Sequence, residues 1–574
     1  MNTVTPAPTW HHAHAASVAA RRGEPDRRGR WRVLLAMAGF CLLFGALAVR
    51  LVSLGLTAEA AEDGGRNFVL NASQARPDIV DRNNETLATD IKTAALFAEP
   101  RYIIDPDEAT ELIASVLPDI GRDALRRVLS TDAKFAYIRR EITPRQQQAI
   151  HRFGIPGIGF RIENRRFYPG GPAASHVLGA VNIDNKGIAG IEKYIDEAFL
   201  NDLHAAGFVD DHTMEPVRLS LDLRVQHVVR DELVQAMERY QAIAGIGVVV
   251  DVNTGEVLGM SSVPDYDSNS REQALDPNRM NRATVGVYEM GSTFKGFTVA
   301  MALDAGVANI NDSFDASHAL SVGRFTINDF HGKRRWLTVP EIFIYSSNIG
   351  AARMALALGN EGQHDYFERL GLLNTLKTEL PETGAPIVPA MPWPKVTTIT
   401  MAFGHGVSVS PLQTAAAGAA LVNGGFYMTP TFLPRTIDEA AAVAQSVLRP
   451  ETSETMRNLF RLNVLKGSGK RAGVEGYSVG GKTGTAEKVE NGRYTSSKRR
   501  NAFLAAFPMD APKYLVLVLL DEPKPETPGR GATAGSNTAP TVANIIRRIA
   551  PMLGIEPKVV DPAEEPALAL ASAQ

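Results

Sequence analysis

The chain has one cysteine in 574 residues, which excludes an intramolecular disulfide. Lysine and arginine number 60 against 63 aspartates and glutamates, a formal net charge of −3, so the composition gives no general case for nucleic-acid binding. The sequence has no zinc-ligand spacing, phosphate loop or dinucleotide fingerprint. Three histidines near the N-terminus, His11, His12 and His14, have no other candidate ligands around them. We therefore expect no metal and no cofactor.

The N-terminal part of the chain has the pattern of a membrane anchor. Residues 1–32 carry six arginines against two acidic residues, and the 17 residues 33–49 contain no charge. As a helix this stretch spans about 25 Å, and Arg50 can snorkel so that the apolar length extends toward the ~30 Å of a bilayer core. Arginines before an anchor keep the N-terminus cytoplasmic. We predict a cytoplasmic leader at 1–32 and one transmembrane anchor at 33–56 in the inner (cytoplasmic) membrane, with Cys41 as a small apolar residue within it.

A cleaved signal peptide is the alternative interpretation of this segment. Ala58-Glu59-Ala60 is an acceptable cleavage site. Against cleavage stand the long polar leader and an apolar stretch longer than a usual signal-peptide core. Either interpretation places the residues beyond 60 outside the cytoplasm, so we predict a periplasmic location for the rest of the chain.

Three short strings follow one another in the second half of the chain: Ser292–Lys295 (S-T-F-K), Ser346–Asn348 (S-S-N) and Lys482–Thr485 (K-T-G-T). Taken singly, each has an ordinary structural explanation: a serine cap before a solvated lysine, a polar capping cluster, and an exposed strand with a lysine. Together they supply a serine nucleophile, a lysine base, a second hydroxyl, an amide and a second lysine. This set in this order predicts serine acyl transfer that uses lysine in place of a histidine triad.

Ser292 is the predicted nucleophile. It opens an apolar stretch with helical spacing, residues 291–307, and the unpaired N–H groups at a helix start favour an alkoxide and an oxyanion. Lys295 lies three residues on and shares the same helix face. A lysine acts as a base only if burial or a second cation lowers its pKa, and Lys482 is the candidate for that cation.

The middle string falls at a loop between two apolar helices, one over 339–345 and one over 349–358. Ser346 is suited to relay a proton between the lysine and the leaving group. Asn348 is suited to accept a hydrogen bond from the lysine or to hold a substrate amide. We therefore expect both residues to be catalytic.

The third string lies in a strand-like stretch, residues 477–489, that is rich in glycine. Glycine within a strand often marks the close approach of a ligand or another backbone, and such a strand can bind a peptide edge-on. Charge and hydroxyl groups would hold the terminal carboxylate of that peptide. The predicted substrate-binding residues are Thr483, Gly484 and Thr485, together with Lys482.

With these strings the chain resembles a class B penicillin-binding protein, a peptidoglycan D,D-transpeptidase, and within that family the septal, FtsI-like type. The resemblance covers about residues 33–553. Further matching segments are Arg76–Asn83, Arg166–Pro169, Gly187–Glu192, Val263–Asp267, Asn281–Ala283, Gly404–Gly406, Ser410–Gln413 and Asn423–Gly425. Departures from the family pattern occur at Pro77, Asn84 and Met290, and none touches a reacting group. Asn84 stands where glycine is common, a mild change because asparagine tolerates positive φ.

The resemblance implies an α+β, serine β-lactamase/transpeptidase-like fold, an antiparallel sheet flanked by helices, with an N-terminal pedestal and one transmembrane helix. A hairpin at 246–262 and strands at 477–487, 502–507 and 514–521 are expected in one sheet, followed by a helix at 540–553. The predicted divisions are a leader (1–32), an anchor (33–56), a non-catalytic, dimerisation-like pedestal (57–215), a transpeptidase domain (216–553) and a disordered tail (554–574).

The resemblance also implies the reaction. Ser292 attacks the carbonyl between two terminal D-alanines of a stem peptide, Lys295 takes its proton, and the backbone N–H groups of Ser292 and Thr485 hold the oxyanion. Ser346, assisted by Lys482, passes the proton to the departing amine, and an amine of a neighbouring stem peptide then forms the crosslink. β-Lactams acylate Ser292 as substrate mimics. Which lysine is the base stays open because the two are coupled.

Other functions remain as alternatives. An elongation-type transpeptidase differs mainly in cellular role, and the septal choice depends on length, the compact N-terminal module and overall similarity. A β-lactamase needs a base that delivers water, and the sequence identifies none. A β-lactam sensor needs a large cytoplasmic output domain, which 32 residues cannot supply, and an inert scaffold would not need the intact residue set.

The expected partners follow from the resemblance alone. They are peptidoglycan stem peptides, β-lactams, a SEDS-family glycosyltransferase and other membrane proteins of the divisome. Septal relatives contact the glycosyltransferase through the membrane helix and the pedestal. The acceptor amine and the need for a partner are left open.

Overall fold

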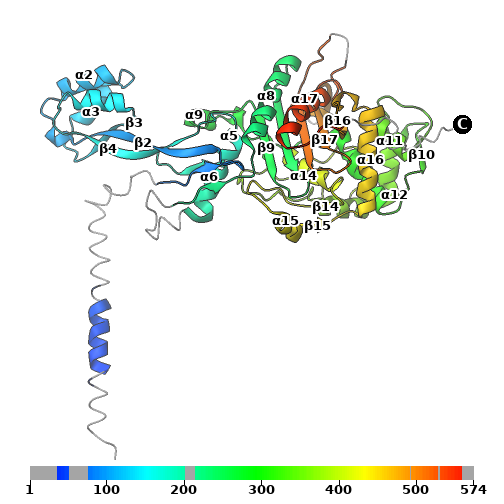
Figure 1. Cartoon of the computed structure of the whole chain (residues 1–574), viewed down its shortest axis with the longest axis horizontal. Helices are drawn as coiled ribbons and strands as arrows, with labels where there is room; N and C mark the ends of the chain where they lie inside the picture. Colours follow the sequence, from blue (N-terminus) through cyan, green and yellow to red (C-terminus); the bar gives the residue numbers. More distant parts are fainter. Residues whose placement is uncertain are drawn as a thin grey trace, which may run out of the picture. The chain divides into compact units, whose positions relative to one another are not determined.

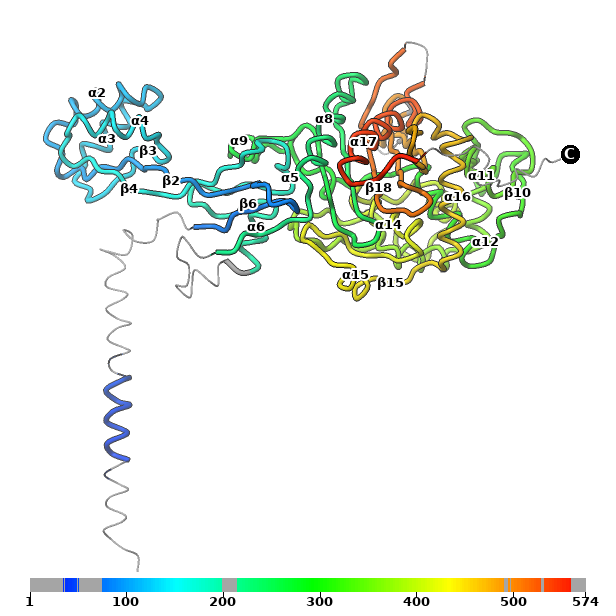
Figure 2. The backbone as a smooth tube through the Cα atoms, in the orientation of Figure 1, coloured from blue at the N-terminus to red at the C-terminus, as the bar shows by residue number. Residues whose placement is uncertain are grey.

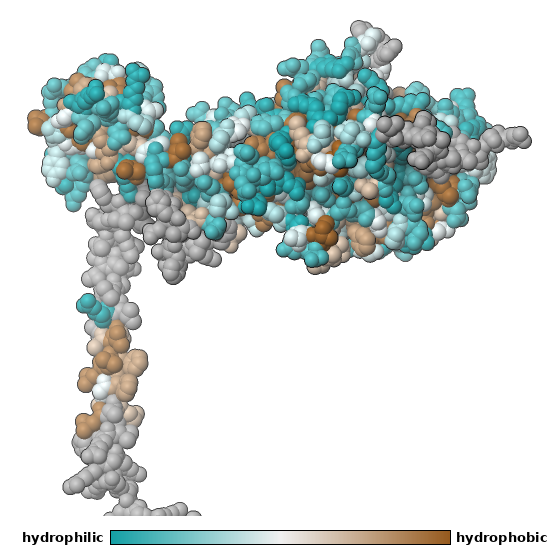
Figure 3. All heavy atoms as spheres, viewed as in Figure 1, coloured by the Kyte–Doolittle hydropathy of each residue, from teal (hydrophilic) through white to brown (hydrophobic). Residues whose placement is uncertain are grey.

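The computed structural model describes residues 35, 37–48, 50, 75–200, 214–490, 493–527 and 531–558 (Figure 1). The chain divides into two units, Met1–Ala72 and Ser73–Gln574. In the first unit, residues 37–48 are helical and expose hydrophobic side chains such as Phe40 and Leu42 (Figure 3). No helix among the described residues is both long enough and apolar enough to cross a bilayer.

Parts of several predictions therefore lie outside the described residues. They are the leader at 1–32, much of the anchor at 33–56, the first part of the pedestal and most of the tail. Cys41, within the helical stretch, is exposed. The anchor remains a prediction.

The second unit begins with a sheet built on one long strand, β2 (Thr86–Ala98). β2 pairs antiparallel with β4 (Ile158–Phe167) from Thr89↔Phe167 to Ala98↔Ile158, and with β3 (Ala136–Ile142) near its end. Three helices pack there around Leu96 and Ile113: α2 (Pro106–Val116), α3 (Arg122–Leu129) and α4 (Pro144–His151).

A buried ionic network holds the other end of this sheet together. Arg76 Nε donates to Glu192 Oε2 at 2.8 Å and Arg166 Nε donates to Glu192 Oε1 at 2.6 Å, with all three side chains almost fully buried. The two arginines outweigh the effect of burial and lower the pKa of Glu192. Three of the segments that carried the resemblance thus meet at one carboxylate. Directly after the first of them, Asn84 has φ +67°, as its place in a glycine position predicted.

Replacing Glu192 with glutamine should destabilise the chain by about 3–5 kcal/mol, because two buried guanidinium groups lose their counter-charge. The matched control is Glu111→Gln, whose ion pair with Arg122 is exposed and should contribute about 1 kcal/mol or less. The measurement is thermal unfolding of the full chain. Because the folded-state pKa of Glu192 is lowered, its contribution should be present above the ordinary glutamate pKa and lost as pH falls through the lowered one. Equal effects of the two substitutions would contradict this account.

The second sheet has five antiparallel strands in the order β16-β17-β18-β8-β9. Its middle strand, β18, is labelled in Figure 2. Their bounds are β16 (Gly480–Glu490), β17 (Arg493–Phe507), β18 (Tyr514–Asp521), β8 (Ala244–Asp251) and β9 (Val257–Val263). Alternate residues face two cores: Val248 and Leu517 face one, and Val249 and Val516 face the other. The prediction of one sheet from the early hairpin and the late strands is confirmed, and β16 lies at its edge.

Helices cover both faces of this sheet. α8 (Leu223–Tyr240) and α17 (Thr538–Met552) pack on the face of Val249, and α10 (Lys295–Asp304) and α14 (Pro411–Ala420) on the face of Val248. The closing helix expected at 540–553 is thus present as α17.

The remaining helices of this part are α5 (Ser175–Leu178), α6 (Gly190–Ile195), α9 (Arg271–Ala274), α11 (Val339–Tyr345), α12 (Asn348–Arg369), α13 (Lys395–Met401), α15 (Ile437–Val443) and α16 (Pro450–Lys466). The short strands are β1 (Ile79–Val80), β5 (Ala180–Val181), β6 (Gly187–Ala189), β7 (Val217–Arg218), β10 (Ser313–Asp315), β11 (Leu320–Val322), β12 (Phe325–Ile327), β13 (Trp336–Thr338), β14 (Phe426–Tyr427) and β15 (Gln445–Ser446). The helix expected at 349–358 corresponds to the first part of α12, which breaks at Gly359 (φ +82°) before continuing.

Candidate active site

The turn that carries Ser292 is pressed against the edge strand β16. Residues Gly291–Phe294 form a 3-10 turn, η5, that leads into α10 at Lys295. Gly291 has φ +53°, and a Cβ there would lie 2.7 Å from the carbonyl oxygen of Thr485. Only glycine permits both the backbone conformation and the contact. The prediction of Ser292 at a helix start is confirmed, although its own turn is 3-10 and α10 ends at Asp304.

Both lysines meet at the hydroxyl group of Ser346, and Lys295 also reaches Ser292, the predicted nucleophile. Lys295 Nζ lies 3.0 Å from Ser292 Oγ and 3.1 Å from Ser346 Oγ, and it also donates to the carbonyl oxygen of Ser346 at 2.5 Å. Lys482 Nζ lies 3.0 Å from the same Ser346 Oγ. The structure therefore brings together groups that are up to 190 positions apart in the sequence.

Both lysines are buried, at 1% exposed for Lys295 and 0% for Lys482. Burial and the neighbouring charge of Lys482 lower the pKa of Lys295 well below its usual value, against a smaller opposing effect of Asp329. Burial lowers the pKa of Lys482 to about 7. A buried amine that has lost its proton can accept one from a serine hydroxyl. Ser292 itself is only half-buried, so a substrate can reach it.

The backbone of Ser346 directs its hydroxyl group toward the lysines. Ser346 ends α11 in the left-handed region with φ +57°, a conformation that costs a non-glycine residue about 1–2 kcal/mol and tends to occur where function requires it. The next residue has a structural role: Ser347 Oγ accepts from the backbone N–H of Gly350 at 3.0 Å and caps α12. The two serines of the string therefore have different tasks.

Asn348 lies beside this cluster but does not bond to the lysine. Within the described part of the chain, the three hydrogen bonds of Lys295 go to serine oxygens. The first of the two roles expected for Asn348, accepting from the lysine, is not seen here and stays a prediction. Its side-chain amide donates instead to the carbonyl oxygen of Asn328 at 2.8 Å. The second role, holding a substrate amide through its Oδ1, stays a prediction.

The K-T-G-T string lies on β16, the edge strand, as edge-on substrate binding requires. A Cβ on Gly484 would lie 2.4 Å from the carbonyl oxygen of Met290, which explains the glycine in this strand. Thr483 Oγ1 and Ser468 Oγ share a hydrogen bond of 2.6 Å, and Thr485 Oγ1 accepts from the N–H of Ala534 at 3.3 Å. Thr485 is half-buried and Thr483 nearly buried.

Two groups near the site have no signal in the sequence. Asp329 accepts from Ser347 Oγ at 2.7 Å and from the N–H of Ile349 at 3.0 Å, so it fixes the start of α12. Asn463 Nδ2 donates to the carbonyl oxygen of Gly481 at 2.7 Å and supports β16 from α16. Both belong to no recognisable motif, and only their contacts across the fold reveal them.

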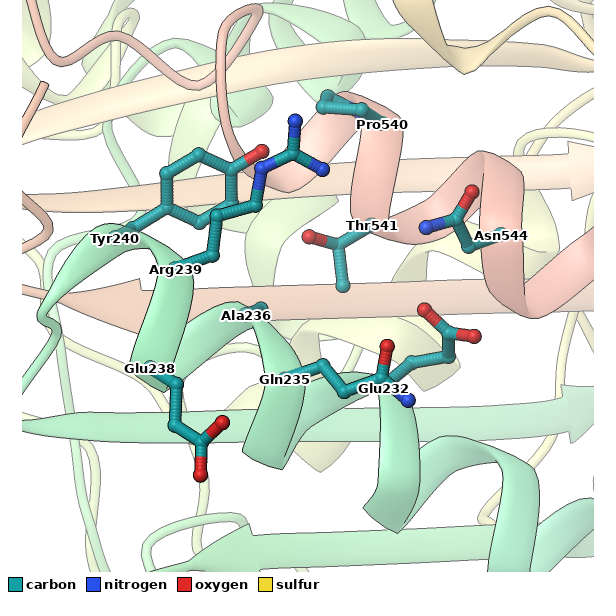
Figure 4. A pocket seen from close by; sticks show the side chains of 9 residues that line it. All are labelled: Glu232, Gln235, Ala236, Glu238, Arg239, Tyr240, Pro540, Thr541 and Asn544. Carbon is teal, nitrogen blue, oxygen red and sulfur yellow. The ribbon is translucent and has the colours of Figure 1, made fainter. Parts of the chain in front are cut away.

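A separate surface hollow lies between α8 and α17 (Figure 4). Its lining includes Glu232, Arg239, Tyr240 and Asn544, and none of the predicted site residues. Arg239 pairs with Glu526 there. We assign the hollow no part in the chemistry of Ser292.

The comparisons with known proteins agree with this geometry. Residues 245–547 match the penicillin binding protein transpeptidase domain, and residues 72–199 match the penicillin-binding protein dimerisation domain. The chain is 39% identical to the probable peptidoglycan D,D-transpeptidase FtsI of Caulobacter vibrioides, over 95% of this chain and 92% of the relative. It is 28% identical to the peptidoglycan D,D-transpeptidase FtsI of Escherichia coli, over 85% of each chain. A peptidoglycan synthetase structure from Bifidobacterium adolescentis shares the fold, with a TM-score of 0.66 at 21% identity over 85% of this chain and 97% of the other.

Proposed function

Since the chain belongs to the class B penicillin-binding proteins, we propose that it is a serine-type peptidoglycan D,D-transpeptidase that crosslinks stem peptides through an acyl-enzyme on Ser292. The observation that carries the proposal is the chain of hydrogen bonds from Ser292 through Lys295 and Ser346 to Lys482, with both lysines buried. Two relatives are named FtsI, which favours septal cell-wall synthesis over the elongation type.

Acylation begins when Ser292 attacks the carbonyl between the two terminal D-alanines. Lys295 is the base in this proposal, because its Nζ is 3.0 Å from Ser292 Oγ and its pKa is lowered well below the ordinary lysine value. The backbone N–H groups of Ser292 and Thr485 hold the oxyanion. The terminal carboxylate of the substrate binds to Lys482, Thr483 and Thr485, with Gly484 allowing close contact.

The proton then leaves Lys295 through Ser346, whose Oγ lies within 3.1 Å of both ammonium nitrogens. Ser346 delivers the proton to the departing D-alanine amine, and the charge of Lys482 supports this transfer. An amine of a second stem peptide enters, returns a proton along the same route and takes the acyl group from Ser292. Asn348 positions a substrate amide throughout.

The location and partners belong to the same proposal. The arginine-rich leader and the apolar segment at 33–56 support a single-pass inner-membrane anchor with the enzyme domain in the periplasm. A septal role favours association with a SEDS-family glycosyltransferase and other divisome membrane proteins. Fluorescence imaging of a tagged copy tests the role: we expect enrichment at the division site.

The lifetime of the penicillin adduct separates this proposal from a β-lactamase. Within the described residues, the hydrogen bonds of the Ser292 and Ser346 hydroxyls go to lysines, and no carboxylate bonds to either group. Without a base that activates water, the acyl-enzyme should persist for many minutes after excess penicillin is removed. Intact-protein mass spectrometry over time measures the adduct. Release within seconds would make the protein a hydrolase.

A further inference from the structure

An exposed basic segment, residues 324–336, lies beside the middle string. It contains four basic residues and one acidic residue, and residues 331–336 are all exposed. The segment includes β12 and the loop that leads to β13. Two large aromatic side chains are also exposed in it, Phe330 at 71% and Trp336 at 61%. Exposed aromatic rings among cations are typical of a binding surface.

The positive charge of the basic segment is largely uncompensated. Its only carboxylate, Asp329, bonds inward to Ser347 and Ile349. Arg335 pairs with Glu341. Within the part of the chain that the structure describes, no carboxylate pairs with Arg324, Lys333 or Arg334. Lys333 Nζ lies 4.6 Å from the centre of the Tyr345 ring, and such a cation remains available to an anion.

The basic segment is fixed to the residues that surround Ser346. The carbonyl oxygen of Asn328 accepts from Asn348, and Asp329 caps the start of α12. Tyr345, beneath Lys333, directly precedes Ser346. Lys333 therefore lies over the ring of the residue that directly precedes Ser346. The K-T-G-T strand already accounts for the terminal carboxylate, so these cations require a different anionic group.

We propose that the basic segment binds carboxylate groups of the stem peptide upstream of the two terminal D-alanines. Lys333 and Arg334 supply charge-assisted hydrogen bonds, and Phe330 offers an apolar contact. This inference rests on the proposed function and adds a specificity element to it. The basic segment would distinguish stem peptides with free carboxylates from stem peptides in which the same groups are amidated.

The test uses the full chain with Ser292→Ala, which binds peptide without acylation. The probes are two fluorescent pentapeptides, L-Ala-γ-D-Glu-L-Lys-D-Ala-D-Ala, with the glutamyl α-carboxylate free or amidated. Fluorescence anisotropy gives both affinities at low and high salt. We expect the free carboxylate to bind at least about fivefold more tightly, with the difference shrinking as salt rises.

The double substitution Lys333→Gln and Arg334→Gln should remove this preference and bring the ratio of the two affinities close to one. The matched control, Lys377→Gln with Arg547→Gln, changes two exposed cations on other elements and should keep the ratio. The ratio is insensitive to a general loss of binding, because that would weaken both peptides equally.

Three results would overturn the inference. The Ser292→Ala chain with an unchanged basic segment would bind the two peptides equally, or the double variant would keep the ratio of the two affinities. The third is that the peptide with the free carboxylate does not bind at millimolar concentration. Equal affinities would direct attention to an acidic protein partner for this surface. Failure of the proposed function would be recognised by a different result: the chain with Ser292 intact would then take no label from penicillin.

Discussion

Replacing Ser292 with alanine should abolish covalent labelling by a fluorescent penicillin. The labelled bond forms at the hydroxyl oxygen, and the neighbouring hydroxyl of Ser346 is held between the two lysine nitrogens, where it relays protons. Ser292 is half-buried in a turn whose position depends on Gly291 and Gly484, so the substitution removes one oxygen and leaves the turn intact. In-gel fluorescence of the full chain measures the loss.

The control for this substitution is Ser115→Ala, an exposed serine of α2 whose labelling should equal that of the unchanged chain. Thermal unfolding of the Ser292→Ala variant should match the unchanged chain within a few degrees. Full labelling of the alanine variant would show that another residue is the nucleophile and would overturn the mechanism.

Replacing Lys295 with methionine should lower the second-order rate of acylation by penicillin by about 10³-fold. Methionine keeps the unbranched shape in a position only 1% exposed, so packing is largely preserved. The loss is that of the base 3.0 Å from Ser292 Oγ, and general bases contribute about 10²–10⁴-fold. Stopped-flow or quenched labelling gives the rate. The control, Lys377→Met at an exposed position, should leave the rate unchanged.

The pH dependence of the acylation rate tests whether Lys295 acts as the base. Burial and the charge of Lys482 lower the pKa of Lys295, so its neutral form persists to a lower pH than that of an exposed lysine. As pH falls through this lowered pKa, Lys295 gains a proton and acylation should slow. Lys295→Met should remove that acid limb and leave a slow rate that varies little with pH. If Lys295→Met keeps the acid limb, another group is the base.

Much of the site was predictable because it is encoded in short, local strings. Gly291 and Ser292 predict a helix start. Gly484 predicts the close approach of another group to the strand, and that group is the carbonyl oxygen of Met290. The sheet was predictable because its strands are apolar and the apolar helices between them in the sequence can pack on it. Asn84 adopts the positive φ expected of a residue in a glycine position.

The rest depends on contacts between distant segments. Asp329 touches the site only because the loop after β12 folds back onto the start of α12, and no periodicity in the sequence encodes that path. The sequence offered two plausible partners for Asn348, and neither is the carbonyl of Asn328, 20 positions away, to which its side-chain amide donates. The conformation of Ser346 was equally hidden, since serine has no preference for positive φ and the fold imposes it.

The most direct test of the central claim is to locate the penicillin adduct by peptide mass spectrometry on the unchanged full chain. The account predicts a single penicilloyl group on the peptide that contains Ser292, formed near neutral pH. An adduct on Ser346, on Ser347 or on any other residue, with Ser292 unmodified, would contradict it.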